Sequence, residues 1–237
     1  MPPHVSPPVC ANFSSEKLTI GAGVAIFHLA TERVVVCYHS RDKYWFLPKG
    51  RRNANETTGT GAEREGFEES GYRNRLIPLP MRHRQPAPDE GPEPFVTEPL
   101  WTQLLPLTAT SQYMLFWYAA ETIPPEVEQS YDCAAPSSDV GSLSRVYQPP
   151  QPFPRDTSLQ QRISADTITG DDGTQRFYEP IWHPGTGVDE EEELYRSFLL
   201  TVTEACRKLK GSVMEDVVRK GWEGVQQRMK MEAGDVA

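Results

Sequence analysis

The chain has 237 residues, of which 38% are hydrophobic and 24% are charged. This length and composition suit one domain with additions and allow a sizeable buried core. The formal net charge of −9 argues against a general nucleic-acid-binding protein, because such proteins concentrate basic residues.

Targeting and membrane segments are not predicted. No apolar run approaches the roughly 18 residues that a membrane-spanning helix needs. The first ten residues, MPPHVSPPVC, lack the basic and apolar regions of a signal peptide. We therefore expect a protein of the cytoplasm, with the nucleus as the alternative.

The cysteines are few and far apart. They are Cys10, Cys37, Cys133 and Cys206, and they form no CxxC pair. This spacing predicts reduced thiols and indicates neither a disulfide framework nor a zinc site.

The N-terminal part is expected to be a tail followed by strands. Residues 1–17 contain four prolines and are expected to form a tail, while residues 18–237 are expected to form a single domain. The segments 18–29 and 34–40 are rich in β-branched residues, which predicts a hairpin or two strands of one sheet. Their nearly continuous apolarity indicates burial on both faces. A third short strand is expected at 44–47, leading into Pro48, Lys49 and Gly50.

A crowded set of carboxylates occupies the next segment. We predict a helix over residues 58–70 that ends at Gly71. Glu65, Glu68 and Glu69 stand at i, i+3 and i+4, so a helix places all three on one face, where like charges repel one another. A core-facing helix would carry apolar residues there, and a solvated helix would usually mix in lysines. A hard divalent cation, which prefers carboxylate oxygens, removes the repulsion.

The spacing of Gly50, Glu56, Arg64, the three glutamates and Gly71 resembles the Nudix box of the MutT-like hydrolases. The resemblance implies an α/β fold, an α/β/α sandwich with a mixed sheet, to which this chain would add long loop insertions and C-terminal helices. It also implies dependence on Mg²⁺ or Mn²⁺. By the same resemblance, Glu65, Glu68 and Glu69 would be metal ligands with the Gly50 carbonyl, Arg64 would orient Glu65, and Glu56 would pair with Arg64.

Two further features refine this resemblance. The box usually has an aliphatic residue where this chain has Gly66, so a side chain from elsewhere, or Phe67, is expected to fill the gap. The entry Trp-x-Leu-Pro-Lys-Gly resembles the branch that includes diadenosine-polyphosphate hydrolases, some diphosphoinositol-polyphosphate hydrolases and mRNA-decapping enzymes.

Beyond the box the pattern alternates between strands and long irregular segments. A strand is expected at 74–79, then a proline-rich loop over 78–106 with a short element at 99–105. The aromatic segment 111–121 predicts a central strand. Residues 123–174 are rich in proline and serine, which indicates an insertion. Order is expected to resume at 175–182, ahead of a helix.

Two helices are expected at the C-terminus. The acidic run 189–193 would begin the first, because negative charge is favourable at a helix start, and this explanation is preferred to metal binding. An apolar stripe from Tyr195 to Leu209 would form its buried face, and Gly211 would end it. Ser212 and Glu215 would form a capping box that starts the second helix.

Basic residues indicate where phosphates would bind. Lys49, Arg51 and Arg52 lie at the entry to the box, and Arg82 and Arg84 follow the next strand. Because arginine suits phosphate contacts, these five residues are candidate substrate-binding residues.

The predicted activity is hydrolysis of a diphosphate bond by a metal-dependent pyrophosphohydrolase. The expected substrate is a small-molecule polyphosphate, either a dinucleoside polyphosphate or a diphosphoinositol polyphosphate. Capped RNA, or a nucleotide sugar or ADP-ribose, is the alternative. A non-catalytic binding protein is disfavoured, because it has no physical reason to keep the carboxylates crowded. The general base would be Glu65, or one of Glu98, Glu121 and Glu179 outside the box.

Overall fold

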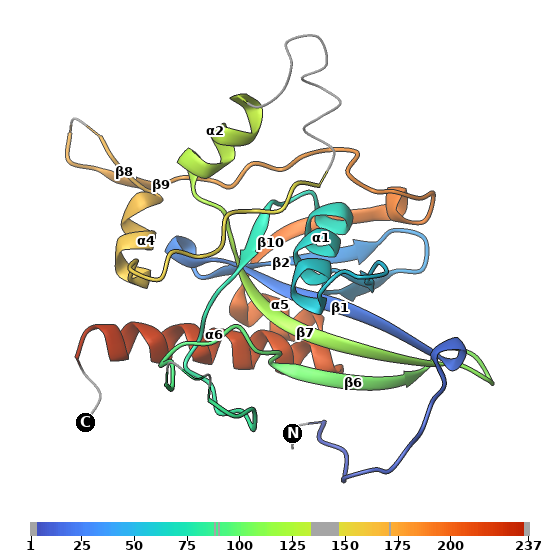
Figure 1. Ribbon diagram of the computed structural model, residues 1–237. Helices are drawn as coiled ribbons and strands as arrows, with labels where there is room; N and C mark the ends of the chain where they lie inside the picture. The colour runs from blue at the N-terminus through green and yellow to red at the C-terminus, as the bar shows by residue number, and fades with distance from the viewer. Residues whose placement is uncertain (1–3, 88, 90, 134–146, 171, 235–237) are drawn as a thin grey trace.

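The computed structural model describes residues 4–87, 89, 91–133, 147–170 and 172–234. Its main feature is an eight-stranded mixed sheet with helices on both faces (Figure 1). The strands of this sheet are β1 (Leu18–His28), β2 (Arg33–His39), β3 (Tyr44–Phe46), β4 (Lys49–Arg51), β5 (Asn74–Leu76), β6 (Trp101–Pro106), β7 (Gln112–Thr122) and β10 (Tyr195–Thr201). The helices are α1 (Thr58–Ser70), α2 (Pro125–Cys133), α4 (Leu159–Ala165), α5 (Val202–Lys208) and α6 (Val213–Glu232). The predicted α/β class with a mixed sheet is confirmed.

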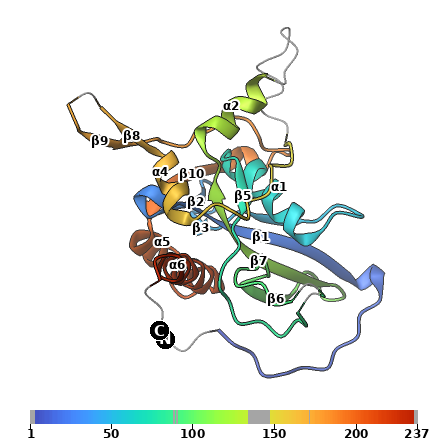
Figure 2. The same cartoon turned by 60° about the vertical axis from the view of Figure 1, so that its left-hand side comes forward.

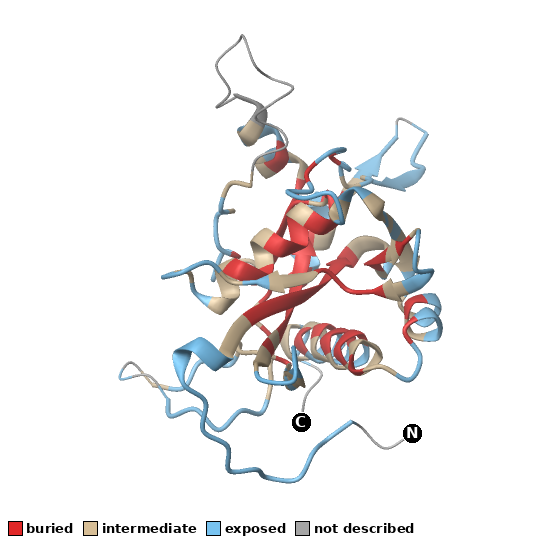
Figure 3. Ribbon diagram, turned by 90° about the vertical axis from the view of Figure 1, so that its right-hand side faces the viewer, coloured by how far each residue is buried: buried red, intermediate tan, exposed pale blue. Residues whose placement is uncertain are grey.

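The sheet is built around one parallel pair. Strands β1 and β7 run parallel from Leu18 opposite Gln112 to Phe27 opposite Glu121, and the other strand pairs of this sheet are antiparallel. The order is β10-β2-β1-β7-β5, while β3, β4 and β6 pair with β2, β1 and β7. Both central strands are buried over most of their length, as their nearly continuous apolarity predicts (Figure 3).

The two faces of the sheet carry separate cores. Helix α1 covers one face, where Val24, Ile26 and Ala62 belong to a small apolar cluster. Helices α5 and α6 cover the other face, where Trp117 and Trp222 belong to a larger cluster. In Figure 1 these helices lie on opposite sides of the strands. The helix pair therefore supplies most of the apolar packing, while α1 keeps a face for polar side chains.

The proline- and serine-rich segment contains regular elements as well as loops. Helices α2 and α4 and the hairpin of β8 (Thr167–Thr169) and β9 (Gln175–Phe177) lie beyond one end of the sheet (Figure 2). Helix α4 is attached by a buried ion pair between Arg162 and Glu121 on β7, at 2.7 Å, and Arg162 also pairs with Asp166 at the end of its own helix, at 2.9 Å. The part of the predicted insertion at 134–146 lies outside the described residues.

The C-terminal region differs from the sequence prediction. Residues Tyr195–Thr201 form strand β10 rather than the first half of a helix, and α5 begins only at Val202. Strand β10 pairs with β2 along its whole length, from Tyr195 opposite His39 to Thr201 opposite Arg33. The prediction was wrong because an apolar spacing compatible with a helix was overridden by hydrogen bonds from a distant strand.

The start of this region also differs. The acidic run leads into a short 3₁₀ turn at Glu192–Leu194 and not into an α-helix, and no helix follows directly after residue 182. Helix α5 has its own capping box, formed by Thr201 and Glu204. The acidic run is therefore free to serve another purpose.

The last helix begins where it was predicted, but without the predicted capping box. Gly211 has a φ of 84° and separates α5 from α6. The Ser212 hydroxyl donates to the Leu209 carbonyl at 2.7 Å, and the Glu215 carboxylate accepts from the Gly211 amide at 3.1 Å. The two side chains thus close the turn before the helix instead of capping it reciprocally.

Two expectations from composition can be compared with the described residues. Cys10, Cys37 and Cys206 are free thiols. Among the described helices, none combines the length and apolarity required to cross a membrane.

Candidate active site

Helix α1 has the predicted bounds. Its N-cap residue Thr57 accepts a hydrogen bond from the Thr60 amide at 3.1 Å. It ends at Gly71, whose φ of 75° lies in the left-handed region that favours glycine. The helix therefore presents its glutamates from the predicted segment.

Arg64 pairs with two carboxylates of this helix and with one in the loop before it. Its guanidinium donates to Glu56 at 2.9 Å, to Glu65 at 2.8 Å and to Glu68 at 2.7 Å. A further bond of 2.9 Å reaches the carbonyl of Arg51 on β4. One arginine thus offsets part of the repulsion among three carboxylates and connects the helix to the preceding strand.

The gap at Gly66 is filled from the sheet. A Cβ atom at this position would lie 2.6 Å from Nδ2 of Asn74 and 2.9 Å from Cγ1 of Val24. Asn74 also donates a hydrogen bond of 3.0 Å to the Glu63 carbonyl. Asn74 and Val24 therefore occupy the space that an aliphatic residue would take, and Phe67 is not required for this purpose.

Three carboxylates meet at one point. Glu65 and Glu69 of α1 and Glu192 of the acidic run each offer an oxygen, and these oxygens lie within 4.8 Å of one another. Glu68 is on the same helix face and lines the same cavity, but it is bonded to Arg64 and is not part of this trio. The acidic run, which we assigned to a helix start, instead brings a glutamate to the box.

The path of the chain explains how Glu192 reaches α1. The segment before it follows the last turn of the helix through three hydrogen bonds, from Trp182 to the Ser70 carbonyl, from His183 to the Gly71 carbonyl and from Thr186 to the Glu68 carbonyl, at 3.1, 2.9 and 2.8 Å. These bonds satisfy carbonyl groups at the helix end.

Glu191, next to Glu192, attaches the acidic run to the sheet. Glu191 bonds to the buried ring of His39 at 3.0 Å and to Arg41 at 3.1 Å, and both residues belong to the β2–β3 hairpin. The Glu192 carboxylate itself accepts from the Val188 amide at 2.6 Å. The run is therefore held between the helix and the sheet.

Burial shifts the protonation of these carboxylates. It raises the pKa of Glu65 to about 7 and that of Glu69 to about 8, although Arg64 and Lys49 respectively oppose the shift. Burial also raises the pKa of Glu68 and of Glu192. Carboxylates crowded in this way gain from a nearby cation, which favours their charged form.

Gly50 approaches the cluster closely. A Cβ atom there would overlap the Glu65 carboxylate, so only glycine fits. The Gly50 carbonyl accepts a hydrogen bond of 2.8 Å from the Tyr113 hydroxyl, and the neighbouring Lys49 amide donates to the Glu69 carboxylate at 2.7 Å. Strand β4 thus bonds to Glu69 through its backbone and packs against Glu65 at its glycine.

A cavity of about 610 Å³ surrounds this cluster. Of the predicted substrate-binding residues, Lys49, Arg51 and Arg52 line it. Arg82 and Arg84 do not; they are exposed on the loop after β5. The structure thus brings together the basic residues of the box entry and leaves the second basic group outside the cavity.

The expected general bases outside the box lie elsewhere. Glu121 is buried between Arg75 and Arg162, with contacts of 2.6 and 2.7 Å. Glu179 is paired with Arg33 at 2.6 Å, and Glu98 does not line the cavity. Glu192 was missed because its approach to α1 depends on contacts more than 100 residues apart in the sequence.

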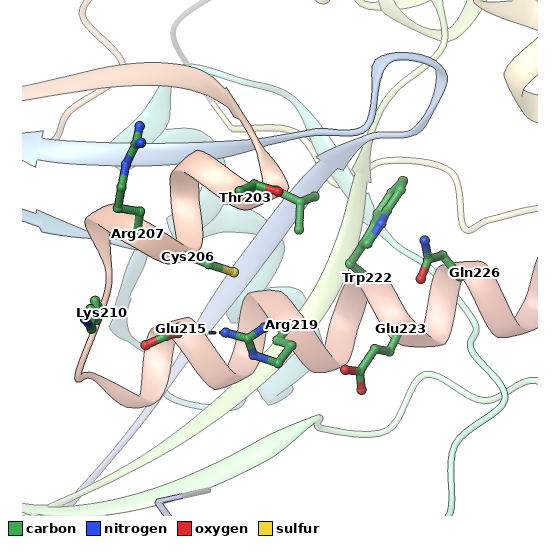
Figure 4. Close-up of a pocket in the computed structure, with 10 residues that line it drawn as sticks. Thr203, Cys206, Arg207, Lys210, Glu215, Arg219, Trp222, Glu223 and Gln226 are labelled. Carbon is green, nitrogen blue, oxygen red and sulfur yellow. Dashed lines mark hydrogen bonds and ion pairs between the residues drawn. The ribbon is translucent and has the colours of Figure 1, made fainter. Parts of the chain in front are cut away.

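A second cavity, of about 470 Å³, lies between α5 and α6 (Figure 4). Its lining includes Cys206, Trp222 and Glu215, and Glu215 is paired with Arg219 at 2.7 Å. No cluster of three metal-binding groups among the described residues lies in it. The carboxylate cluster lies in the cavity beside α1.

Comparison with solved structures gives distant similarities. A NUDIX hydrolase from Nitrosomonas europaea is 9% identical, with 88% of this chain and 90% of that chain covered and a TM-score of 0.45. A C. elegans Ap4A hydrolase binary complex is 12% identical, with 88% and 98% covered and a TM-score of 0.40. A NUDIX-family hydrolase from Clostridium perfringens is 14% identical, with 88% and 97% covered and a TM-score of 0.40.

Comparison at the level of sequence is decisive for the family. No curated protein matches the chain. The model of the NUDIX domain, however, matches residues 17–136, which is half of the chain and includes the whole box. The chain therefore belongs to the Nudix family of hydrolases.

Proposed function

We propose that the protein hydrolyses a diphosphate bond in a polyphosphorylated small molecule, either a dinucleoside polyphosphate or a diphosphoinositol polyphosphate. The observation that carries this proposal is the convergence of Glu65, Glu69 and Glu192 in a cavity with Lys49 and Arg51 at its rim. Carboxylates that hold a divalent cation next to basic side chains that bind phosphate are the usual requirements for cleaving phosphoanhydrides.

The donor set fits Mg²⁺ or Mn²⁺. Both cations prefer oxygen ligands, and each of the three glutamates offers a carboxylate oxygen. When bound, such a cation neutralises phosphate oxygens and lowers the pKa of a water molecule.

The other residues of the site hold these oxygens in place. Arg64 bonds Glu65, the Lys49 amide bonds Glu69, and the Tyr113 hydroxyl bonds the Gly50 carbonyl. Each of these three oxygen donors is thereby oriented by a hydrogen bond, which limits the rearrangement needed during reaction.

As the alternative to its role as a cation ligand, Glu192 is our candidate for the proton acceptor from outside the box. It is half-buried, lines the cavity and belongs to the trio of carboxylates. Glu121 and Glu179 are held in ion pairs with arginines. A carboxylate within reach of the reacting water is the first requirement for a general base.

The rim of the cavity supports a substrate with several phosphates. Arg51 is exposed and lines the cavity, so it can contact phosphate groups that the carboxylate site does not hold. Capped RNA is less well supported, because a nucleic-acid strand needs an extended basic path and Arg82 and Arg84 do not extend this rim.

A substrate panel tests the proposal. Diadenosine polyphosphates, a diphosphoinositol polyphosphate, ADP-ribose and capped RNA would be incubated with Mg²⁺ or Mn²⁺, and the products identified. Glu69→Gln should lower turnover by about 10²-fold or more. Glu223→Gln on α6, which does not line this cavity, serves as the matched control and should retain the parent rate.

Metal binding provides an independent measurement. Mg²⁺ or Mn²⁺ should raise the melting temperature of the parent, because a cation that binds the native state stabilises it. The variant Glu65→Gln/Glu69→Gln/Glu192→Gln should show no such rise in melting temperature. An equal rise in parent and variant, or full activity of Glu69→Gln, would overturn the proposed site.

A further inference from the structure

A large groove adjoins the active-site cavity. It encloses about 980 Å³ and lies on the face of the sheet that α6 covers only in part. In Figure 1, β6 and β7 extend beyond the N-terminal end of α6, and the N-terminal segment passes below them. The side chains that line the groove include Trp101, Gln103, Leu105, Leu115, Trp117 and Met214.

Lys49 connects the groove to the active site. It lines both cavities, and its backbone amide bonds Glu69. On the adjacent strand, a Cβ atom at Gly23 would lie 2.8 Å from Cβ of Lys49 and 2.5 Å from the Trp117 ring, so the glycine lets these two side chains meet over β1. Lys49 is therefore the residue that a molecule extending from the carboxylate cluster into the groove would pass.

The lining of the groove has few charged side chains, which indicates the kind of ligand that would fit it. Among the described lining residues, His4 and Lys49 are the only ionisable side chains. Gln103 accepts a hydrogen bond from the Trp117 indole at 3.2 Å, which leaves its amide N–H groups available as donors. An inositol ring carrying many phosphates needs several cations around it. An aromatic base, with apolar faces and a polar edge, matches this lining.

The N-terminal segment forms the outer wall. His4 binds Asp216 on α6 through both its backbone amide, at 3.2 Å, and its ring, at 2.7 Å. Val5 and Val9 line the groove and are nevertheless 70% and 72% exposed. A ring bound between these valines and β6 would cover apolar surface that now faces solvent.

We propose that this groove binds the aromatic base of a nucleotide substrate, with residues 4–9 as its outer wall. This inference rests on the proposed function and narrows it, because it selects dinucleoside polyphosphates over diphosphoinositol polyphosphates. The phosphates would extend from the groove past Lys49 to the carboxylate site.

Binding of AMP tests the groove without requiring catalysis. Leu105→Trp places a bulky ring in the groove, and Ile168→Trp makes the same change on the exposed β8–β9 hairpin as a matched control. Titration of AMP, followed by NMR of its base protons, should show about tenfold weaker binding to Leu105→Trp and unchanged binding to Ile168→Trp. A Val5→Ser/Val9→Ser variant should also bind AMP more weakly.

Mn²⁺ binding, read by electron paramagnetic resonance, separates the two proposals. The Mn²⁺ affinity should be the same in the parent and all three variants, since none alters a carboxylate of the cluster. Equal AMP binding by the parent and Leu105→Trp, or no AMP binding by a parent that binds Mn²⁺, would overturn the groove assignment alone. Unchanged AMP binding by Val5→Ser/Val9→Ser would remove the N-terminal wall. A parent that neither binds Mn²⁺ nor hydrolyses any substrate would instead contradict the proposed function.

Discussion

Gly50 and Glu65 are packed so closely that any side chain at position 50 would overlap the Glu65 carboxylate. Glu65 is buried and bonded to Arg64, so it has little room to move away. We expect Gly50→Ala to displace the carboxylate and to lower kcat/KM by about 10²-fold, the effect of a misplacement of about 1 Å. Steady-state hydrolysis at saturating Mg²⁺ measures this.

Gly59→Ala is a suitable control for that substitution. Gly59 lies in the first turn of α1, and a Cβ atom there meets only Leu76, at 3.1 Å, and the Thr57 hydroxyl, at 3.9 Å. The control should keep the parent rate. A Gly50→Ala enzyme as active as the control would show that the close packing has no role in catalysis.

Replacing Glu192 tests the contribution of the acidic run. Glu192→Gln removes one charge from the cluster while keeping the shape of the side chain, so Mn²⁺ affinity should fall by about tenfold or more. Isothermal titration with Mn²⁺ measures it. Glu193→Gln changes the exposed neighbour and should leave the affinity unaltered. Equal affinities in the two variants would exclude Glu192 as a ligand.

The two arginines at the rim should behave differently. The Arg52 guanidinium donates to the carbonyls of Asn53 and Glu56 at 3.2 and 2.9 Å, so it supports the loop, whereas Arg51 is exposed. Arg51→Ala should lower kcat/KM for a five- or six-phosphate dinucleotide. The corresponding loss of transition-state stabilisation should be about 1.5 to 3 kcal/mol per charged hydrogen bond lost. The kcat/KM for ADP-ribose should barely change. Arg52→Ala should impair both substrates. Equal losses on both substrates in Arg51→Ala would argue against a polyphosphate preference.

Placing at position 66 the aliphatic residue that the box usually has should destabilise the protein. Gly66→Ile would force its side chain into Val24 and Asn74, and overpacking of this kind costs about 1 to 3 kcal/mol in the free energy of unfolding. Chemical denaturation measures the loss. Adding Val24→Ala should recover part of it, because the two positions share one space. A Gly66→Ile variant as stable as the parent would contradict the packing described above.

His28 should make stability depend on pH. Burial, and next the charge of Arg33, lower the pKa of His28 to about 4 from its ordinary 6.5. Between these pH values the unfolded chain binds a proton at position 28 that the folded chain does not, so the contribution of His28 to stability falls by up to about 3 kcal/mol as the pH drops from about 6.5 to about 4. The raised pKa values of Glu65 and Glu69 act in the opposite direction. Asp166, 3.5 Å from the ring, and Arg162 also face this group.

Comparing pH profiles isolates that histidine. His28→Gln removes the titrating group, so the free energy of unfolding of the parent, measured relative to that of His28→Gln at each pH, should decrease as the pH drops over this range. His83→Gln, on an exposed loop, should follow the parent curve. Parallel curves of unfolding free energy against pH for His28→Gln and the parent would show that His28 does not contribute to the pH dependence of stability.

The sequence by itself determined the helix and the crowding of carboxylates on it. The positions of Glu65, Glu68 and Glu69 on one face follow from the helical repeat, and the helix end follows from Gly71, so both are local properties. The burial of the first strand on both faces and the central place of the aromatic strand were also predicted, because strands buried on both faces must be apolar throughout. The parallel pairing of these two strands was not predicted.

Only the tertiary structure decided which carboxylates meet. Residues 195–201 have an apolar spacing that suits a helix, but pairing with β2 makes them a strand. Glu192 reaches Glu65 and Glu69 because the chain ahead of it is bonded to the end of α1. Such contacts join residues more than 100 positions apart, and no pattern within a short stretch of sequence predicts them. The spacing within a helix is fixed by its own backbone, whereas the place of a loop is fixed by the surface against which it packs.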